Sequence, residues 1–191
     1  MQPDGITWSG PKYRKQKMRP ERFSRTDKSG KLFEIGLSCA EDFPAVLEMY
    51  RTFSPKPASQ GLPPEDPEVC QNWVKTLFDI GVNVLAWRGD SVIGHVALIP
   101  DVERKSGELV TFVYQNHRNL GVGTEQTRFA LEKSGDLGFE LVWLAVRVLN
   151  FVAIKLYKKL GFEFCDMDTY ERVMIIELGS TGGLVIPVER P

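Results

Sequence analysis

The sequence has little cysteine and no long apolar run. Three of its 191 residues are cysteine, and Cys39, Cys70 and Cys165 lie too far apart to form the close pairs of zinc sites or redox motifs. Scattered thiols in an odd number indicate a reducing compartment. No stretch approaches the roughly 20 apolar residues of a membrane helix, and residues 1–10 lack the features of a secretory signal. We therefore expect a soluble, cytoplasmic protein with no membrane partner.

An excess of charge of one sign is also missing. The 24 Lys and Arg residues nearly balance the 25 Asp and Glu residues, so the overall charge argues against a nucleic-acid partner. Locally, residues 12–31 hold a run of basic side chains against Glu21 and Asp27 alone. We interpret residues 1–31 as a basic N-terminal arm, either a solvated leader or a strip that docks on an acidic partner.

The rest of the chain alternates between strand and helix patterns. A Pro-rich loop precedes a helix that Asp66 and Pro67 begin, and turn residues at 88–91 join two antiparallel strands. We predict strands at 32–38, 82–87, 92–99, 108–114, 141–148, 162–164 and 172–178, and helices that begin after Asp42, after Asp66, at about Gly121 and at about Asn150. The Asp42 side chain is expected to cap the first of these helices. This order indicates one mixed α/β domain over 32–178, α+β by some schemes, and a tail at 179–191.

A glycine turn joins the fourth predicted strand to the following helix. Gly121 and Gly123 leave backbone amides uncovered where the helix begins, and a helix N-terminus carries partial positive charge. Arg118 and Thr124 can add further donors. Gln126 stands where the dinucleotide fingerprint has its third glycine, and the Gly-Lys-Ser/Thr of a P-loop is absent. The turn therefore predicts a ligand with a di- or polyphosphate, other than NAD or ATP.

Two segments resemble the signatures of the GNAT superfamily of acyl-CoA-dependent N-acyltransferases. Residues 113–124, VYQNHRNLGVGT, resemble the pyrophosphate signature, a valine-ending strand followed by Arg/Gln-x-x-Gly-x-Gly/Ala. Residues 150–162, NFVAIKLYKKLGF, resemble the second signature, Asn-x-x-Ala-x-x-Leu-Tyr-x-x-x-Gly-Phe. Gln115 and His117 depart from the usual pattern, but neither change removes a phosphate-binding amide.

The resemblance, which covers residues 32–178, implies a fold and a cosubstrate. The fold would be a mixed, mostly antiparallel sheet with helices on both faces, in which the fourth and fifth strands splay around acyl-CoA. Acetyl-CoA would be the cosubstrate, and the basic arm is a second candidate partner for its phosphates. The backbone of Val113 would face the acyl group, and Asn150 would contact the pantetheine arm. The other residues expected to bind CoA form one loop around the pyrophosphate: Arg118, Asn119, Leu120, Gly121, Val122, Gly123 and Thr124.

The resemblance also implies catalytic roles. Tyr157 has the position of the general acid that protonates the departing thiolate, and Glu108 lies near the position of a glutamate base. Each has a structural interpretation as well, Tyr157 on the buried stripe of a helix and Glu108 as a solvated carboxylate at a strand end. His95 and His117, the only histidines, are weaker candidates for the base. Direct attack of an amine on a thioester requires no metal.

The expected reaction moves an acetyl group from acetyl-CoA to a primary amine of a small molecule or a protein within a ternary complex. Residues 49–64 bear a loose likeness to bacterial protein-lysine acetyltransferases, and the Pro-rich loop would border the acceptor. Two alternatives stay open: a non-catalytic acyl-CoA sensor that acts through the basic arm, and a nucleic-acid-associated module anchored by it. A homodimer is a further expectation.

Overall fold

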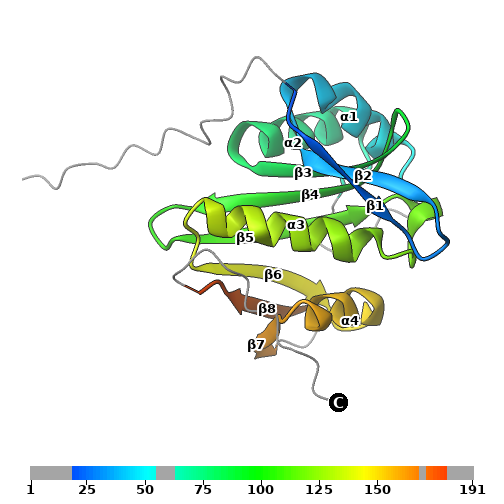
Figure 1. The fold of residues 1–191 in the computed structure, drawn as a ribbon. Coiled ribbons are helices and arrows are strands. Elements are labelled where there is room, and N and C mark those ends of the chain that lie inside the picture. The colour runs from blue at the N-terminus through cyan, green and yellow to red at the C-terminus, as the bar shows by residue number, and fades with distance from the viewer. Residues whose placement is uncertain (1–18, 55–62, 168–170, 180–191) are drawn as a thin grey trace, which may run out of the picture.

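The computed structural model describes residues 19–54, 63–167 and 171–179. Within them the chain forms one eight-stranded sheet with helices on both faces (Figure 1). The strands are β1 (Arg22–Thr26), β2 (Leu32–Leu37), β3 (Val82–Arg88), β4 (Ser91–Asp101), β5 (Ser106–Val113), β6 (Leu141–Arg147), β7 (Glu163–Met167) and β8 (Glu171–Glu177). The helices are η2 (Ala40–Asp42), α1 (Phe43–Arg51), α2 (Pro67–Ile80), η3 (Gln115–His117), α3 (Val122–Asp136) and α4 (Phe151–Lys159). No helix in these ranges is long and apolar enough to span a membrane.

The sheet has the strand order β1-β2-β3-β4-β5-β6-β8-β7. All neighbours are antiparallel except β5 and β6, which are parallel. Arg88 pairs with Ser91 across the β3–β4 turn, and Gly89 between them has a φ of 59°, which a residue without Cβ adopts without strain. The predicted hairpin and the mixed, mostly antiparallel sheet are both confirmed.

The edge strand β1 corrects the prediction of a basic arm over residues 1–31. Residues 22–26 pair with β2 along their whole length. The Arg22 guanidinium lies 4.1 Å from the centroid of the Trp87 ring, and the Phe23 ring lies 5.6 Å from that of Phe129 on α3. Arg22 and Arg25 hid the strand, because basic residues are typical of a solvated segment, whereas here the backbone pairs with β2 and both side chains are partly buried. Residues 1–18 of the predicted arm, 55–62 of the predicted loop and 180–191 of the predicted tail lie outside the described residues.

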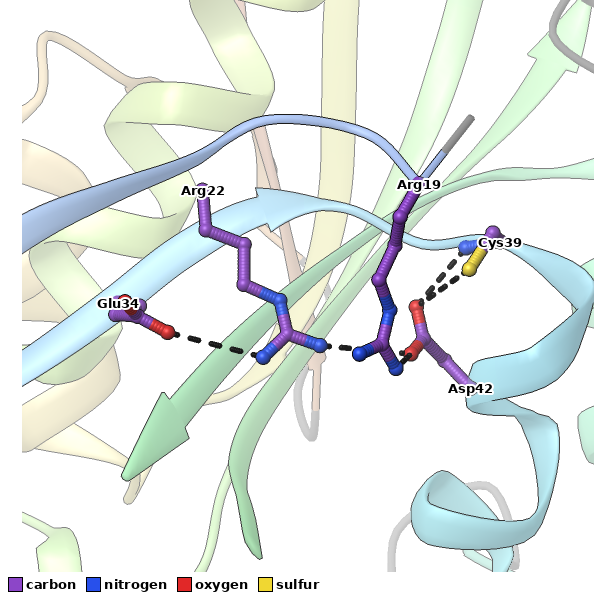
Figure 2. Close-up of polar contacts among 5 residues, drawn as sticks. All are labelled: Arg19, Arg22, Glu34, Cys39 and Asp42. Atoms are coloured by element: carbon purple, nitrogen blue, oxygen red, sulfur yellow. Dashed lines mark hydrogen bonds and ion pairs between the residues drawn. The ribbon is translucent and has the colours of Figure 1, made fainter. Parts of the chain in front are cut away.

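The role of Asp42 also differs from the expected helix cap. Helix α1 begins directly after it, but its buried carboxylate accepts hydrogen bonds from the amide of Cys39 at 3.0 Å and from Arg19 at 2.9 Å (Figure 2). Arg22, which also faces Glu34, lies 3.6 Å from the same carboxylate. Asp42 therefore ties the chain before β1 to the start of α1 rather than capping the helix.

Helix α2 begins and ends where local chemistry predicts. The Asp66 carboxylate accepts hydrogen bonds from the amides of Glu68 at 3.0 Å and Val69 at 2.9 Å, Pro67 occupies the first helical position, and the helix ends at Gly81. These groups satisfy amides that the helix itself leaves unpaired. The expected helix after the Pro-rich loop is confirmed.

The helices bury two apolar clusters on opposite faces of the sheet (Figure 1). One cluster lies under α3 and α4 and includes Phe129, Leu144 and Phe162. The other lies under α1 and α2 and includes Tyr50 and Val74. Because both faces of the sheet are covered, the side chain of each strand residue is fixed on one of the two faces. This decides which side chains reach the region between β5 and β6.

Strands β5 and β6 separate soon after they begin. Their parallel pairing is limited to residues 106–108 opposite residues 141–143. Beyond this point β5 continues with β4 as far as Val113, and β6 continues with β8 as far as Arg147. The facing edges of the two strands have no partner strand there, so their backbone polar groups are available to a ligand. The splay between the fourth and fifth predicted strands is confirmed.

Candidate active site

The separation of β5 and β6 opens a cleft of about 1110 Å³. Its walls are β5 from Glu108 to Val113, the end of β6 and the inner face of α4, and its rim is the turn that leads into α3. Almost all predicted site residues line this cleft: Glu108, Val113, Arg118, Asn119, Leu120, Gly121, Gly123, Thr124, Asn150 and Tyr157. Val122, the first residue of α3, lies between two of them and is fully buried.

The glycine turn presents the start of α3 to the cleft. Asn119 has a φ of 63° and Gly121 a φ of 91°, so the chain twists through the left-handed region before the helix begins. The first helical hydrogen bond of α3 joins the amide of Glu125 to the carbonyl of Gly121 at 3.1 Å. The amides of residues 122–124 therefore precede the helical ladder and can bind an anion.

Gly123 keeps the cleft narrow at this end. A Cβ at Gly123 would lie 3.0 Å from Cδ1 of Leu156 on α4 and 3.2 Å from Cγ2 of Val113 on β5. The backbone of α3 consequently packs against both walls of the cleft. This close approach is a structural reason for glycine in the second position of the turn, beyond the conformational one.

Arg118 has a bond inside the protein that the sequence did not reveal. Its Nε donates a hydrogen bond to the carbonyl of Val113 at 3.1 Å, and its guanidinium lies 4.9 Å from the centroid of the Phe53 ring. Burial lowers the pKa of Arg118 from its usual value, although the group stays charged at neutral pH. The expected contact of Arg118 with a pyrophosphate stays a prediction, and the other guanidinium nitrogens are the atoms that can make it.

Tyr157 lies at the bottom of the cleft on α4. It is only 7% exposed, and its ring meets that of Phe162 edge to face at 5.6 Å. Burial raises the pKa of Tyr157, while a hydrogen bond with the Thr111 side chain lowers it in part. The hydroxyl is therefore protonated at neutral pH and can donate a proton. Sequence reasoning missed Thr111, whose position on the same face of β5 as Val113 follows only from strand alternation.

Glu108 occupies the point where β5 and β6 part. It lies opposite Ile99 of β4 and Trp143 of β6, and its side chain is half-buried. Burial raises the pKa of Glu108 from its usual value. Its side chain lines both the main cleft and a second hollow of about 480 Å³, which Asp101 and Trp143 also line. Glu108 thus connects the cleft with a separate approach from the surface.

Asn150 caps helix α4. Its side-chain carbonyl accepts a hydrogen bond from the amide of Ala153 at 3.2 Å, which satisfies an amide in the first turn of the helix. Asn150 also lines the cleft. One side chain therefore fixes the start of the helix that carries Tyr157, and its expected contact with pantetheine stays a prediction.

Neither histidine lines the cleft. Asn83 Nδ2 donates to the carbonyls of Leu77 and Gly81, so its Oδ1 accepts from Nε2 of His95 at 2.8 Å. Nδ1 of His95, 2.8 Å from the Tyr50 hydroxyl, is then the acceptor and the ring is neutral. The interpretation of His95 as a base is wrong, because the ring is fully buried away from the cleft. His117 contacts Arg88 at 3.1 Å, also outside the cleft lining.

We expect His95 to make the fold sensitive to acid. Burial lowers the pKa of His95 to about 3 from an unfolded value of 6.5. Between these values the unfolded chain binds a proton that the folded chain does not, so stability is complete above pH 6.5 and is lost as the pH falls. Urea unfolding at pH 7 and pH 5 should show a loss of about 2 kcal/mol. The loss should shrink in His95→Gln and persist in His117→Gln, and equal losses in all three proteins would contradict the assignment.

The turn between β1 and β2 lies beside the glycine turn, and it belongs to the basic segment that was a second candidate partner for the CoA phosphates. The amide of Lys28 donates to the carbonyl of Leu120 at 3.0 Å, and Arg25 and Lys28 line the cleft. The run Asp27-Lys28-Ser29-Gly30 is turn chemistry that could have located this hairpin. In the described parts of the chain, no group of three or more His, Cys, Asp and Glu side chains is arranged to hold a metal ion.

Comparison with known sequences agrees with this geometry. Residues 43–162 match the sequence model of the Acetyltransferase (GNAT) family. Streptothricin acetyltransferase from Streptomyces lavendulae is 35% identical over 57 residues, which is 30% of this chain and 30% of the relative. The chain spans less than half the length of the curated relatives it matches.

Solved structures share the fold. The GNAT domain of S. lividans PAT superposes with a TM-score of 0.71 at 14% identity, over 82% of this chain and 97% of that domain. The PaiA N-acetyltransferase from Thermoplasma acidophilum, solved in complex with coenzyme A, has a TM-score of 0.62 at 18% identity, over 76% of this chain and 99% of its own. At these identities the likeness concerns the fold.

Proposed function

The chain belongs to the GNAT acetyltransferase family, and we propose that it transfers an acetyl group from acetyl-CoA to a primary amine of a small molecule or a protein. The observation that carries the proposal is the cleft between β5 and β6, which has an anion-binding helix start at one end and a buried tyrosine hydroxyl inside it. These are the two kinds of group that a thioester of a phosphorylated carrier requires.

The residues present fit acetyl-CoA. The free amides at the start of α3 suit a diphosphate. Glycine at residue 123 lets α3 pack closely on both walls of the cleft, because a Cβ there would crowd Leu156 and Val113. The unpaired edge of β5 between Glu108 and Val113 can hydrogen-bond the amides of an extended arm. Bound acetyl-CoA supplies the thioester whose carbonyl carbon the amine attacks. Binding along β5 would direct that thioester toward Tyr157 and Glu108.

Proton transfers are assigned to two side chains. Tyr157 donates its proton to the sulfur as the C–S bond breaks and regains one from solvent. Glu108 accepts the proton that the amine loses as the C–N bond forms, directly or through water. Their surroundings suit these roles, because burial keeps the Tyr157 hydroxyl protonated and raises the pKa of Glu108 toward neutral pH. Most of the rate enhancement would come from holding the amine against the thioester.

The acceptor is proposed to enter through the second hollow beside Glu108. That hollow brings the carboxyl side chains of Glu108 and Asp101 together with the aromatic face of Trp143. Carboxylates attract an ammonium group before it loses its proton, and an aromatic ring adds a cation–π contact. Arg104, whose Nε lies 3.7 Å from Asp101, limits the negative charge at the rim. Entry on this side would place the amine and acetyl-CoA on opposite sides of the β5–β6 junction.

The proposal is tested by titrating the protein with acetyl-CoA and then measuring free thiol release over a panel of polyamines, amino acids, aminoglycosides and lysine peptides. Binding with turnover supports an acetyltransferase and identifies the acceptor class. Binding without turnover on every amine points instead to an acyl-CoA sensor. A protein that does not bind acetyl-CoA would overturn the proposal.

Glu108→Gln should slow acetyl transfer about tenfold at pH 7, since a half-exposed base can be replaced in part by water. The pKa of Glu108 is raised above 4.5, and a protonated Glu108 cannot act as the base. As the pH is lowered, the wild-type kcat/KM should therefore begin to fall at a pH above 4.5. The variant should lack this acidic limb. The rate at pH 7 and the acidic limb are both read from pH–rate profiles. Glu103→Gln, on the β4–β5 connection, is the matched control. An unchanged acidic limb in Glu108→Gln would remove Glu108 from the reaction.

A further inference from the structure

The turn between β1 and β2 lies beside the start of α3 (Figure 1). It carries Lys28 to the anion-binding end of the cleft. We propose that Lys28 is a phosphate-binding residue of this cleft, which adds to Arg118 a second cationic side chain from outside the glycine turn. The proposal rests on the proposed function, because it takes acetyl-CoA as the ligand. Lys28 belongs to neither GNAT signature, and it lies in the segment whose basic residues the sequence alone could not assign.

Backbone and side chain of Lys28 both lie on the glycine turn. The Lys28 amide donates to the carbonyl of Leu120 at 3.0 Å. The side chain then crosses Gly121, with Cγ 3.8 Å and Cε 3.9 Å from the position that a Cβ of Gly121 would occupy. The absence of a side chain at residue 121 leaves room for the lysine stem. The ammonium group is thereby carried to the rim where the first amides of α3 are free.

The charge of Lys28 is not neutralised within the described residues, where no ion pair involves it. Arg25, the other basic residue of this hairpin at the cleft, differs in this respect, because its Nε lies 3.8 Å from Glu125. Lys28 is also exposed, so its ammonium reaches solvent at the mouth of the cleft. An uncompensated cation beside free helix amides is suited to a ligand with several phosphate charges.

A buried carboxylate holds the turn in place. Asp27 accepts hydrogen bonds from the amide and the hydroxyl of Ser29 at 2.8 and 2.6 Å and from the amide of Lys31 at 3.1 Å. It also forms an ion pair with Arg88 of β3. The Ser29 hydroxyl, with Arg88 and these amides, keeps the pKa of Asp27 below its usual range. Lys28 is thus presented on a turn that is ordered before the ligand binds, which lowers the entropy lost on binding.

The variant that tests the proposal is Lys28→Met, because methionine keeps an apolar stem over Gly121 and removes the charge. Calorimetry should show acetyl-CoA binding about three- to thirtyfold weaker than in wild type, and a weaker dependence of affinity on salt. Lys28→Arg should restore most of the affinity. Lys31→Met removes a lysine from the same hairpin outside the cleft lining and should bind as wild type does. Thermal unfolding of each variant shows whether the hairpin is intact.

Acetyl-CoA offers Lys28 two kinds of phosphate, the 3′-phosphate and the diphosphate. Binding of 3′-dephospho-CoA, which lacks the 3′-phosphate, shows which of them Lys28 contacts. If Lys28 contacts the 3′-phosphate, wild type and Lys28→Met bind 3′-dephospho-CoA equally, and if it contacts the diphosphate, the loss persists. Equal binding of acetyl-CoA by wild type and Lys28→Met overturns the role of Lys28 and leaves the proposed function intact. Acetyl-CoA binding that depends on Lys28 without turnover on any amine supports Lys28 and overturns the proposed transferase. A wild-type protein that does not bind acetyl-CoA overturns both.

Discussion

Tyr157→Phe should lower the turnover of acetyl-CoA with an amine by about two to four orders of magnitude, the range that a general acid contributes. The ring is buried against Phe162, so phenylalanine keeps the packing and removes only the hydroxyl. Acetyl-CoA affinity should therefore change little. Steady-state kinetics should show the loss in kcat, with an unchanged dissociation constant for acetyl-CoA measured by calorimetry.

Tyr114→Phe is the matched control for this experiment. Tyr114 follows β5 and does not line the cleft, so loss of its hydroxyl should leave turnover unchanged. In the wild type, the raised pKa of Tyr157 predicts that the hydroxyl loses its proton at a higher pH than an ordinary tyrosine does. Full turnover in Tyr157→Phe would show that the proton reaches the thiolate from another source, such as water.

Gly123→Val should weaken acetyl-CoA binding about ten- to a hundredfold. A Cβ at this position already lies 3.0 Å from Leu156 and 3.2 Å from Val113, so two further methyl groups must push the start of α3 away from β5 and α4. Overpacking of this kind costs about 1–3 kcal/mol, and about 1.4 kcal/mol corresponds to a tenfold change in affinity. The dissociation constant and the thermal midpoint are the quantities to measure.

Gly135→Val is the matched control for Gly123→Val. It shows whether weaker acetyl-CoA binding comes from the place of residue 123 or from any change of glycine to valine in α3. Gly135 lies in the same helix, and a Cβ there would meet no atom within 4 Å. Its replacement should leave acetyl-CoA binding and stability close to wild type. If Gly123→Val binds acetyl-CoA as Gly135→Val does, the start of α3 does not hold the ligand.

The glycine turn and the helix of Tyr157 could be predicted because their chemistry is local. Gly121 adopts a φ of 91°, which glycine accepts without strain, and Asn150 caps α4 with its own side chain. Each depends on residues within a few positions in the sequence. The same holds for Asp66 at the start of α2.

Other features depended on partners far away in the sequence. The wrong interpretation of His95 came from its residue type, since only packing against Tyr50 and Asn83 shows that the ring is buried and neutral. Asp42 seemed suited to cap α1, but Arg19 and the Cys39 amide compete for its carboxylate. In both cases a contact that the sequence does not encode locally outweighed the local preference.

The sequence by itself determined the order of most elements, the glycine turn before α3 and the resemblance to the acetyltransferase family, because turns, caps and periodicity follow from nearby residues. Only the tertiary structure decided that residues 22–26 form an edge strand and that Lys28 lies on Gly121. It also decided that Thr111 lies near enough to Tyr157 to lower the pKa of its hydroxyl in part. The contacts of Lys28 and Thr111 join segments tens of residues apart, and β1 and β2 form a hairpin at the sheet edge. The free energy of these contacts comes from packing and pairing that exist only once the whole sheet has formed.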